Sequence, residues 1–316
     1  SCIRMYAKLV KPIGTAAKNL HNAIENVAFK YYNGALINCM GMAIENFWHR
    51  EDSAVCRFSG DFQPENRDWF VKHIIQCSYN SVVQGTVYVG DWDMWWSDDN
   101  QAKLNALIHS MSGGPIYISD KLNRSVKDTI MPTIYSDGKI IRMNTPAKPT
   151  VDCLFSDPRT GQSAYKLFNR HYGSGVLAVF NLTESQSAVT TTIGAKDMLL
   201  DQNKEYSVYD WRNMSAVQIS GNDSFEISVS NLDDYRLYIF TPIENDIAVI
   251  GLCEKYMSVA TYSFNNGRLK VFDDGEVTVY CRNRLTVNNK PVKCFKENLY
   301  KFKCTKNFEY LLNGER

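Results

Sequence analysis

The alternation of two hydrophobic periods over roughly the first 140 residues limits the fold more than any other feature of this chain. Short apolar runs, typical of strands buried on both faces, alternate with stretches whose apolar residues recur at helical spacing. The strand-like runs are residues 35–42, 54–59, 86–93 and 113–120, and the helical stretches include 14–33 and 68–84. Because a strand, helix, strand order joins parallel strands, this pattern predicts a parallel sheet of about four βα units.

A different pattern begins after the turn-rich passage at residues 144–162. There, short strands alternate between apolar and polar residues, so that Phe225, Ile227 and Val229 share one face. We therefore predict two domains: residues 1–150 carry the βα units, and residues 151–316 form an antiparallel β-sandwich. The fold class is α/β plus all-β, and about four βα units are half of a complete eight-unit (β/α)8 TIM barrel.

Charge and cysteine usage exclude several kinds of partner. The formal net charge is +1 and no basic run is present, which argues against nucleic acid and anionic lipid as partners. The nine cysteines are scattered and form no C-x-x-C pair, which argues against a disulfide framework and a zinc site and favours a reducing, cytoplasmic location. No stretch approaches the roughly 20 apolar residues needed to span a bilayer, so no membrane partner is expected.

The string "CRFSGDF" at residues 56–62 places a guanidinium and a carboxylate four residues apart. Since side chains of a strand alternate between its faces, Arg57, Ser59 and Asp61 would point the same way. An arginine fork beside a carboxylate can hold a polar ligand, because its donors are planar and permanently charged. The alternative interpretation is a structural ion pair at a strand end, and such pairs are common.

Further polar and aromatic side chains follow the predicted strands at the ends where barrel enzymes carry their chemistry. The residues expected around this opening are Asp61, Asp91, Trp92, Asp93, Trp95, Trp96 and Asp120. Glycoside hydrolysis needs one carboxyl group to protonate the leaving oxygen and another to attack the sugar or activate water. Several carboxylates with tryptophans at one opening therefore favour a carbohydrate substrate.

Five strings in the same order resemble glycoside hydrolase family 36, in the branch of α-galactosidases and raffinose synthase or seed-imbibition-like proteins. They are "INCMGMAIEN", "CRFSGDF", "YNSVVQGTVYVGDWDMWW", "SGGPIYISDKLNRS" and "PTVDCLF". The resemblance runs from about residue 1 to residue 180. The predicted C-terminal sandwich resembles the family only in its type of domain. It implies that residues 1–150 are the C-terminal half of a (β/α)8 barrel.

The resemblance also implies a catalytic scheme without metal or organic cofactor. Members of the family are retaining enzymes with an aspartate nucleophile in a K-x-D motif and an acid/base aspartate in an R-x-x-x-D motif. "RFSGD" fits the second motif, so Asp61 would be the acid/base and Arg57 would bind a sugar hydroxyl. The other substrate-binding residues expected by the same resemblance are Cys39, Gly41, Asp91, Trp92 and Asp93.

One departure from the family pattern leaves three functions open. No K-x-D strand precedes residues 35–42, and we expect the chain to be the C-terminal portion of a longer enzyme. The leading expectation is a hydrolase of α-galactosides such as raffinose-series sugars. A galactosyltransferase of raffinose-synthase type and a non-catalytic sugar-binding or assembly protein are the alternatives. A half barrel exposes strand edges, so a second copy or the N-terminal barrel half is the expected protein partner, and the chain alone should lack activity.

Overall fold

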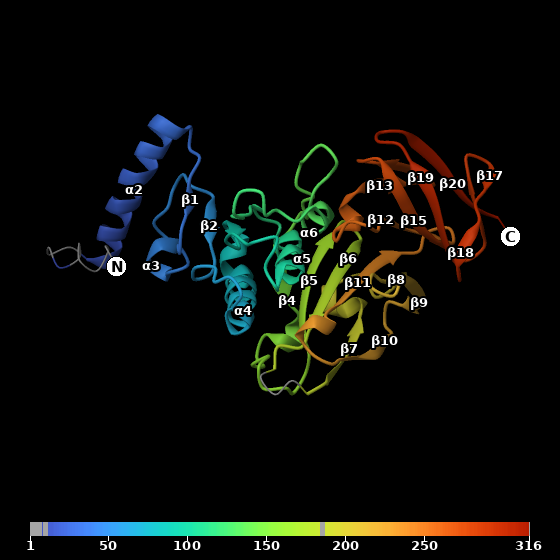
Figure 1. Ribbon diagram of the computed structural model, residues 1–316, viewed down its shortest axis with the longest axis horizontal. Helices are drawn as coiled ribbons and strands as arrows, with labels where there is room; N and C mark the ends of the chain where they lie inside the picture. Colours follow the sequence, from blue (N-terminus) through green and yellow to red (C-terminus); the bar gives the residue numbers. More distant parts are fainter. Residues whose placement is uncertain (1–7, 9–11, 184–186, 316) are drawn as a thin grey trace.

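The computed structural model describes residue 8, residues 12–183 and residues 187–315. Figure 1 shows three groups of elements in succession along the longest axis: a part with most of the helices near the N-terminus, a group of antiparallel sheets, and a second such group at the C-terminus. Cys2 lies outside the described residues, and the cysteines within them are all free. None of the helices in the described residues is both long and apolar enough to traverse a lipid bilayer.

The first group contains the predicted parallel sheet. Its helices are α2 (Ile13–Tyr32), α3 (Ile44–Phe47), α4 (Arg67–Val83), α5 (Ala102–Ser112) and α6 (Lys127–Ile130). Its strands are β1 (Ile37–Asn38), β2 (Val55–Arg57) and β3 (Val89–Asp91), which lie in the order β1-β2-β3 and pair in parallel. The helices expected at 14–33 and 68–84 are thus α2 and α4, and the βα order is confirmed.

The prediction of a fourth strand at residues 113–120 is wrong. Only one parallel bridge forms there, between Trp95 and Ile118. Pro115 has no N–H to donate to a ladder, and a Cβ on Gly114 would collide with the carbonyl oxygen of Gly90 in β3. The described residues therefore form three paired parallel strands and one bridge rather than a closed barrel.

Two groups of antiparallel sheets follow. The strands of the first are β4 (Lys148–Pro149), β5 (Tyr165–His171), β6 (Ser174–Phe180), β7 (Val189–Gly194), β8 (Glu205–Asp210), β9 (Ser215–Ser220), β10 (Ser224–Val229) and β11 (Arg236–Pro242). Those of the second are β12 (Ile247–Leu252), β13 (Tyr262–Asn265), β14 (Arg268–Val271), β15 (Gly275–Cys281), β16 (Arg284–Val287), β17 (Lys290–Pro291), β18 (Cys294–Lys296), β19 (Leu299–Cys304) and β20 (Glu309–Glu315).

Each antiparallel group has two sheets. In the first, a six-stranded sheet in the order β4-β5-β6-β11-β8-β9 accompanies the pair β10-β7. In the second, a four-stranded sheet β12-β15-β19-β18 accompanies a five-stranded sheet β13-β14-β20-β16-β17. Phe225, Ile227 and Val229 all face the core of the first group, as their alternation predicts. The division of the chain at residue 150 stays a prediction.

The strand β6 shows how the groups are joined. Leu177 and Val179 lie in the core between the two sheets of the first antiparallel group. Val176, Ala178 and Phe180 belong to a different core, which also contains residues of α4, α5 and β12. Because successive side chains of a strand point to opposite faces, one apolar strand can serve both cores.

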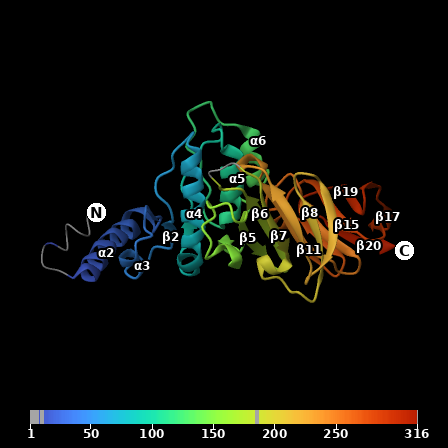
Figure 2. The ribbon, with the colours of Figure 1, turned by 90° about the horizontal axis from the view of Figure 1, so that it is seen from below.

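The helix α2 leaves an apolar stripe uncovered, which leads to a prediction about self-association. Ile24, Val27 and Tyr31 are 41%, 51% and 66% exposed, and Figure 2 shows α2 at the end of the molecule. We expect the 316-residue chain to self-associate, because contiguous exposed apolar surface favours contact with another chain. Light scattering should give a mass above that of one chain, and Ile24→Lys with Val27→Lys should lower it.

The control for this prediction is Leu122→Lys, which replaces a 90% exposed leucine outside α2. It should leave the mass unchanged, since a single exposed apolar side chain is normal on protein surfaces. A monodisperse monomer for the unmutated chain would contradict the prediction.

Candidate active site

The strand register brings three of the predicted site residues to one edge of the parallel sheet. Asn38 of β1 pairs with Cys56 of β2, and Arg57 of β2 pairs with Asp91 of β3. Cys39, which directly follows β1, therefore comes next to Arg57, and all three residues stand at the carboxyl ends of their strands. Carboxyl ends of parallel strands are where α/β enzymes place their chemistry.

Arg57 contacts two carboxylates at this edge. Its Nη2 donates to Asp61 Oδ1 at 2.6 Å, and its Nη1 lies 3.1 Å from Asp93 Oδ2. Burial opposes the charge of Arg57, but the hydrogen bond to Asp61 and the charge of Asp93 raise the pKa of the guanidinium. The Asp61 side chain is 73% exposed while that of Asp93 is 2% exposed, so the arginine holds one accessible and one buried carboxylate.

Behind this pair, Asp91 is fully buried and fixed by two donors. The backbone N–H of Asp93 donates to Asp91 Oδ1 at 2.9 Å, and the Tyr117 hydroxyl donates to Oδ2 at 3.0 Å. Asp93 adopts a left-handed conformation with φ of 68°, and its carboxylate accepts the N–H of Phe62 at 2.7 Å. Burial raises the pKa of Asp91, and the two hydrogen bonds offset that effect only in part.

Two histidines that the sequence analysis did not assign to the site hold the backbone between these aspartates. His73 of α4 and His109 of α5 each donate from Nε2 to the carbonyl oxygen of Trp92, both at 2.9 Å. Their rings are stacked with centroids 6.1 Å apart. Burial lowers the pKa of His73 to about 3 and also lowers that of His109, so burial favours the neutral rings. The sequence signal was weak, since each is a lone histidine within a helical pattern.

Trp92 does not lie where the sequence analysis expected it. Its side chain is fully buried in the core that joins the helices to the sheets. Trp92 packs in this core, whereas the Asp91 carboxylate accepts hydrogen bonds from the Asp93 N–H and Tyr117, and Asp93 pairs with Arg57 at the strand end. An indole without exposed surface offers no face to a sugar. Trp95 is buried in the same core, and only Trp96 of the three is partly exposed.

The remaining predicted residues have structural contacts. Gly41 is buried, and a Cβ there would lie 2.6 Å from Arg50 Nη1 and 2.8 Å from Cys56 Sγ. Glycine is thus needed for close packing beneath the edge where Cys39 is exposed. Asp120 accepts the backbone N–H of Ser97 at 2.6 Å, which ties two loops together. Within the described ranges, no set of three or more His, Cys, Asp or Glu side chains could hold a metal ion.

The buried Asp91 carboxyl gives a prediction for stability against pH. Because its pKa is raised in the folded protein, the folded state binds more protons than the unfolded state above the ordinary value of about 3.9. Its contribution to the free energy of unfolding therefore falls as pH rises through the window between the two pKa values. Asp91→Asn does not titrate, so the stability of the variant relative to the unmutated chain should increase from pH 4 to neutral pH.

Urea unfolding of both proteins at the two pH values measures this difference. Asp68→Asn, at an exposed position in the first turn of α4, is the matched control and should show a smaller change. If the stability of Asp91→Asn relative to the unmutated chain stayed constant or fell toward neutral pH, the raised pKa assigned to Asp91 would be contradicted.

Comparisons with known proteins extend over most of the chain. The family model described as raffinose synthase or seed imbibition protein Sip1 matches residues 13–309. A probable galactinol–sucrose galactosyltransferase 6 of Arabidopsis thaliana is 35% identical over 166 residues, which are 52% of this chain and 22% of that protein. The stachyose synthase of Pisum sativum is 27% identical over 314 residues, covering 87% of this chain and 34% of that protein.

Among solved structures, a putative alpha-galactosidase from Bacteroides fragilis superposes with a TM-score of 0.45 at 14% identity, covering 73% of this chain and 52% of that one. The chain spans about a third or less of the length of the two plant enzymes it matches. The family model, in contrast, covers the parallel strands, the site edge and both antiparallel groups. The chain therefore belongs to the family of raffinose synthase or seed imbibition protein Sip1.

Proposed function

We propose that this chain carries the acid/base part of an active site that transfers galactose from an α-galactoside to a sugar acceptor. The observation that carries the proposal is the Arg57 fork, which holds the exposed Asp61 carboxylate at the carboxyl ends of parallel strands. A fixed cation leaves a carboxyl group accessible at the site edge and restricts its movement.

In the proposed reaction Asp61 acts twice. It first gives a proton to the oxygen of the leaving group, while a carboxylate of the K-x-D motif attacks the sugar and forms a covalent galactosyl-enzyme. It then removes a proton from the acceptor hydroxyl, which attacks the same carbon and releases the enzyme carboxylate. The K-x-D nucleophile is inferred from the family resemblance, and it is not among the site residues described above.

Galactosyl transfer is favoured over hydrolysis by the relatives, which are named galactosyltransferases and stachyose synthase. Hydrolysis, the leading expectation from the sequence, is the second candidate. Water reaches the Asp61 side chain, which is 73% exposed in this chain, and a site open to water at the second step would hydrolyse the intermediate. A non-catalytic sugar-binding protein is the third, since binding alone needs no nucleophile.

Product analysis tests the proposal. The shortest polypeptide that contains this chain and a K-x-D strand is incubated with galactinol and sucrose, and the products are separated by chromatography. Raffinose in excess over free galactose is the expected result. Free galactose without raffinose would contradict the proposal and indicate hydrolysis. The absence of both products would contradict it and indicate a sugar-binding role.

A further inference from the structure

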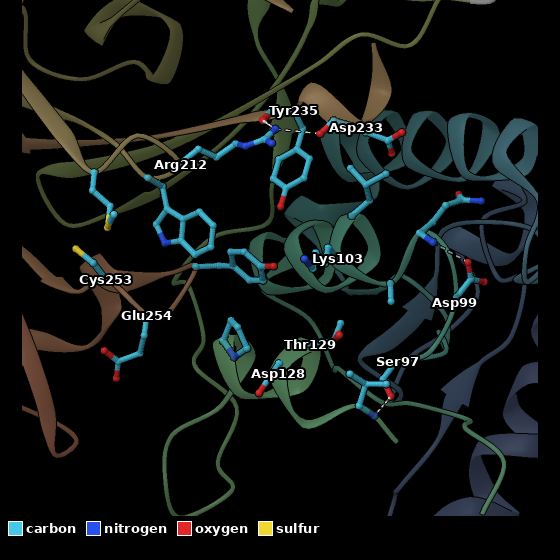
Figure 3. Close-up of a pocket in the computed structure, with 18 of the residues that line it drawn as sticks. Ser97, Asp99, Lys103, Asp128, Thr129, Arg212, Asp233, Tyr235, Cys253 and Glu254 are labelled. Atoms are coloured by element: carbon cyan, nitrogen blue, oxygen red, sulfur yellow. Dashed lines mark hydrogen bonds between the residues drawn. The ribbon is translucent and has the colours of Figure 1, made fainter. Parts of the chain in front are cut away.

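A pocket of about 1120 Å³ lies where the three groups of elements meet. Its walls come from the segment that leads from β3 into α5, from the turn between β8 and β9, and from β15 and β19. In Figure 3 the labelled side chains from these groups surround one central space. Neither Arg57 nor Asp61 lines it. Ligand sites occur preferentially at such junctions and are commonly of comparable volume.

Aromatic rings form one wall of this junction pocket. The rings of Trp211 and Tyr256 lie 5.1 Å apart, tilted by 40°. The guanidinium of Arg212 lies 5.2 Å from the centroid of Tyr235 and is itself fixed by hydrogen bonds to the carbonyl oxygens of Asp233 and Tyr235 at 2.9 and 3.0 Å. Rings held in this way offer rigid apolar surface that needs little ordering when a ligand binds.

Charged residues of both signs line the pocket without partners among the described residues. Lys103, Asp128 and Glu254 line the pocket with exposed side chains, and each lacks a hydrogen bond or ion pair within the part of the chain that the structure describes. Other carboxylates of the lining are already engaged: Asp99 accepts the N–H groups of Glu65 and Gln101, both at 2.8 Å. The pocket therefore presents free donors and free acceptors together.

We propose that the junction pocket binds a neutral oligosaccharide. Sugar hydroxyls both donate and accept, so they can satisfy Lys103 as well as Asp128 and Glu254. The C–H faces of a sugar ring are apolar and can pack against the aromatic wall. An anionic ligand would meet the two carboxylates, and a cationic one would meet the lysine. This proposal does not rest on the proposed catalytic function, because binding is measured without turnover.

Isothermal titration calorimetry of the 316-residue chain with stachyose tests the proposal. Lys103→Met and Glu254→Gln should each weaken binding about tenfold, since hydrogen bonds to charged groups contribute at about that level. Both positions are exposed, so folding should persist, and circular dichroism checks this. Lys196→Met, at an exposed lysine outside the pocket, is the matched control and should bind like the unmutated chain.

A further variant distinguishes binding in the junction pocket from binding at the site of Arg57 and Asp61. In the Asp61→Asn background, Lys103→Met should still weaken stachyose binding about tenfold if the sugar occupies the junction pocket. The proposal is overturned if the unmutated chain does not bind stachyose, if Lys103→Met and Glu254→Gln bind it as tightly as the unmutated chain, or if only Asp61→Asn weakens binding. Tighter binding of an anionic probe, trigalacturonate, would also overturn the assignment to a neutral sugar.

Discussion

Replacing Asp61 by asparagine should lower the rate of galactosyl transfer by about 100- to 10,000-fold, which is the usual contribution of a general acid or base. Asparagine has nearly the same shape but cannot give a proton to the leaving oxygen. The Arg57 guanidinium keeps Asp93 at 3.1 Å, so the strand end should remain folded. The measurement is the initial rate with galactinol and sucrose in the shortest active polypeptide that contains this chain.

The leaving group distinguishes acid catalysis from a structural effect. A nitrophenyl galactoside leaves without protonation, so Asp61→Asn should slow its cleavage in the first step far less than that of galactinol. Asp68→Asn, a matched substitution at an exposed position in α4, should leave both rates unchanged. Equal losses of Asp61→Asn on both substrates would show that Asp61 does not act as the acid.

Lys166→Met should destabilise the fold by about 3–5 kcal/mol, the usual result of removing one member of a buried ion pair. Lys166 is 1% exposed, and its Nζ lies 2.8 Å from both Asp152 and Asp197 and donates to the carbonyl oxygen of Thr192 at 2.9 Å. Without the ammonium group, Asp197 would stay buried without its cation. A loss of this size is a large part of the roughly 5–15 kcal/mol that stabilises a typical protein.

Urea denaturation followed by circular dichroism measures this loss. Lys204→Met is the matched control: Lys204 is 47% exposed and lies 3.8 Å from Glu244. Exposed pairs of this kind contribute at most about 1 kcal/mol, so this variant should stay close to the unmutated chain. If both variants lost the same small amount, the buried cluster would not carry the stability assigned to it.

Local patterns in the sequence were enough to predict the three parallel strands and the contact between Arg57 and Asp61 just after β2. Each of β1, β2 and β3 lies within a short apolar run, and Arg57 and Asp61 are close in sequence, so neither feature needed long-range information. The alternation of Phe225, Ile227 and Val229 likewise predicted their common core. The same strings carried the family resemblance, which the match over residues 13–309 confirms.

Other features depended on contacts between segments far apart in sequence. Trp92 faces the core because α5 and the sheets cover it. The local sequence of a tryptophan beside aspartates does not distinguish a buried side chain from an exposed one. The roles of His73 and His109 exist only because two helices bring both rings to one carbonyl oxygen. The junction pocket brings together Lys103 of the first group and Glu254 of the second antiparallel group, which no local sequence pattern predicts. Periodicity reports which face of an element is buried, whereas the tertiary structure decides what it is buried against.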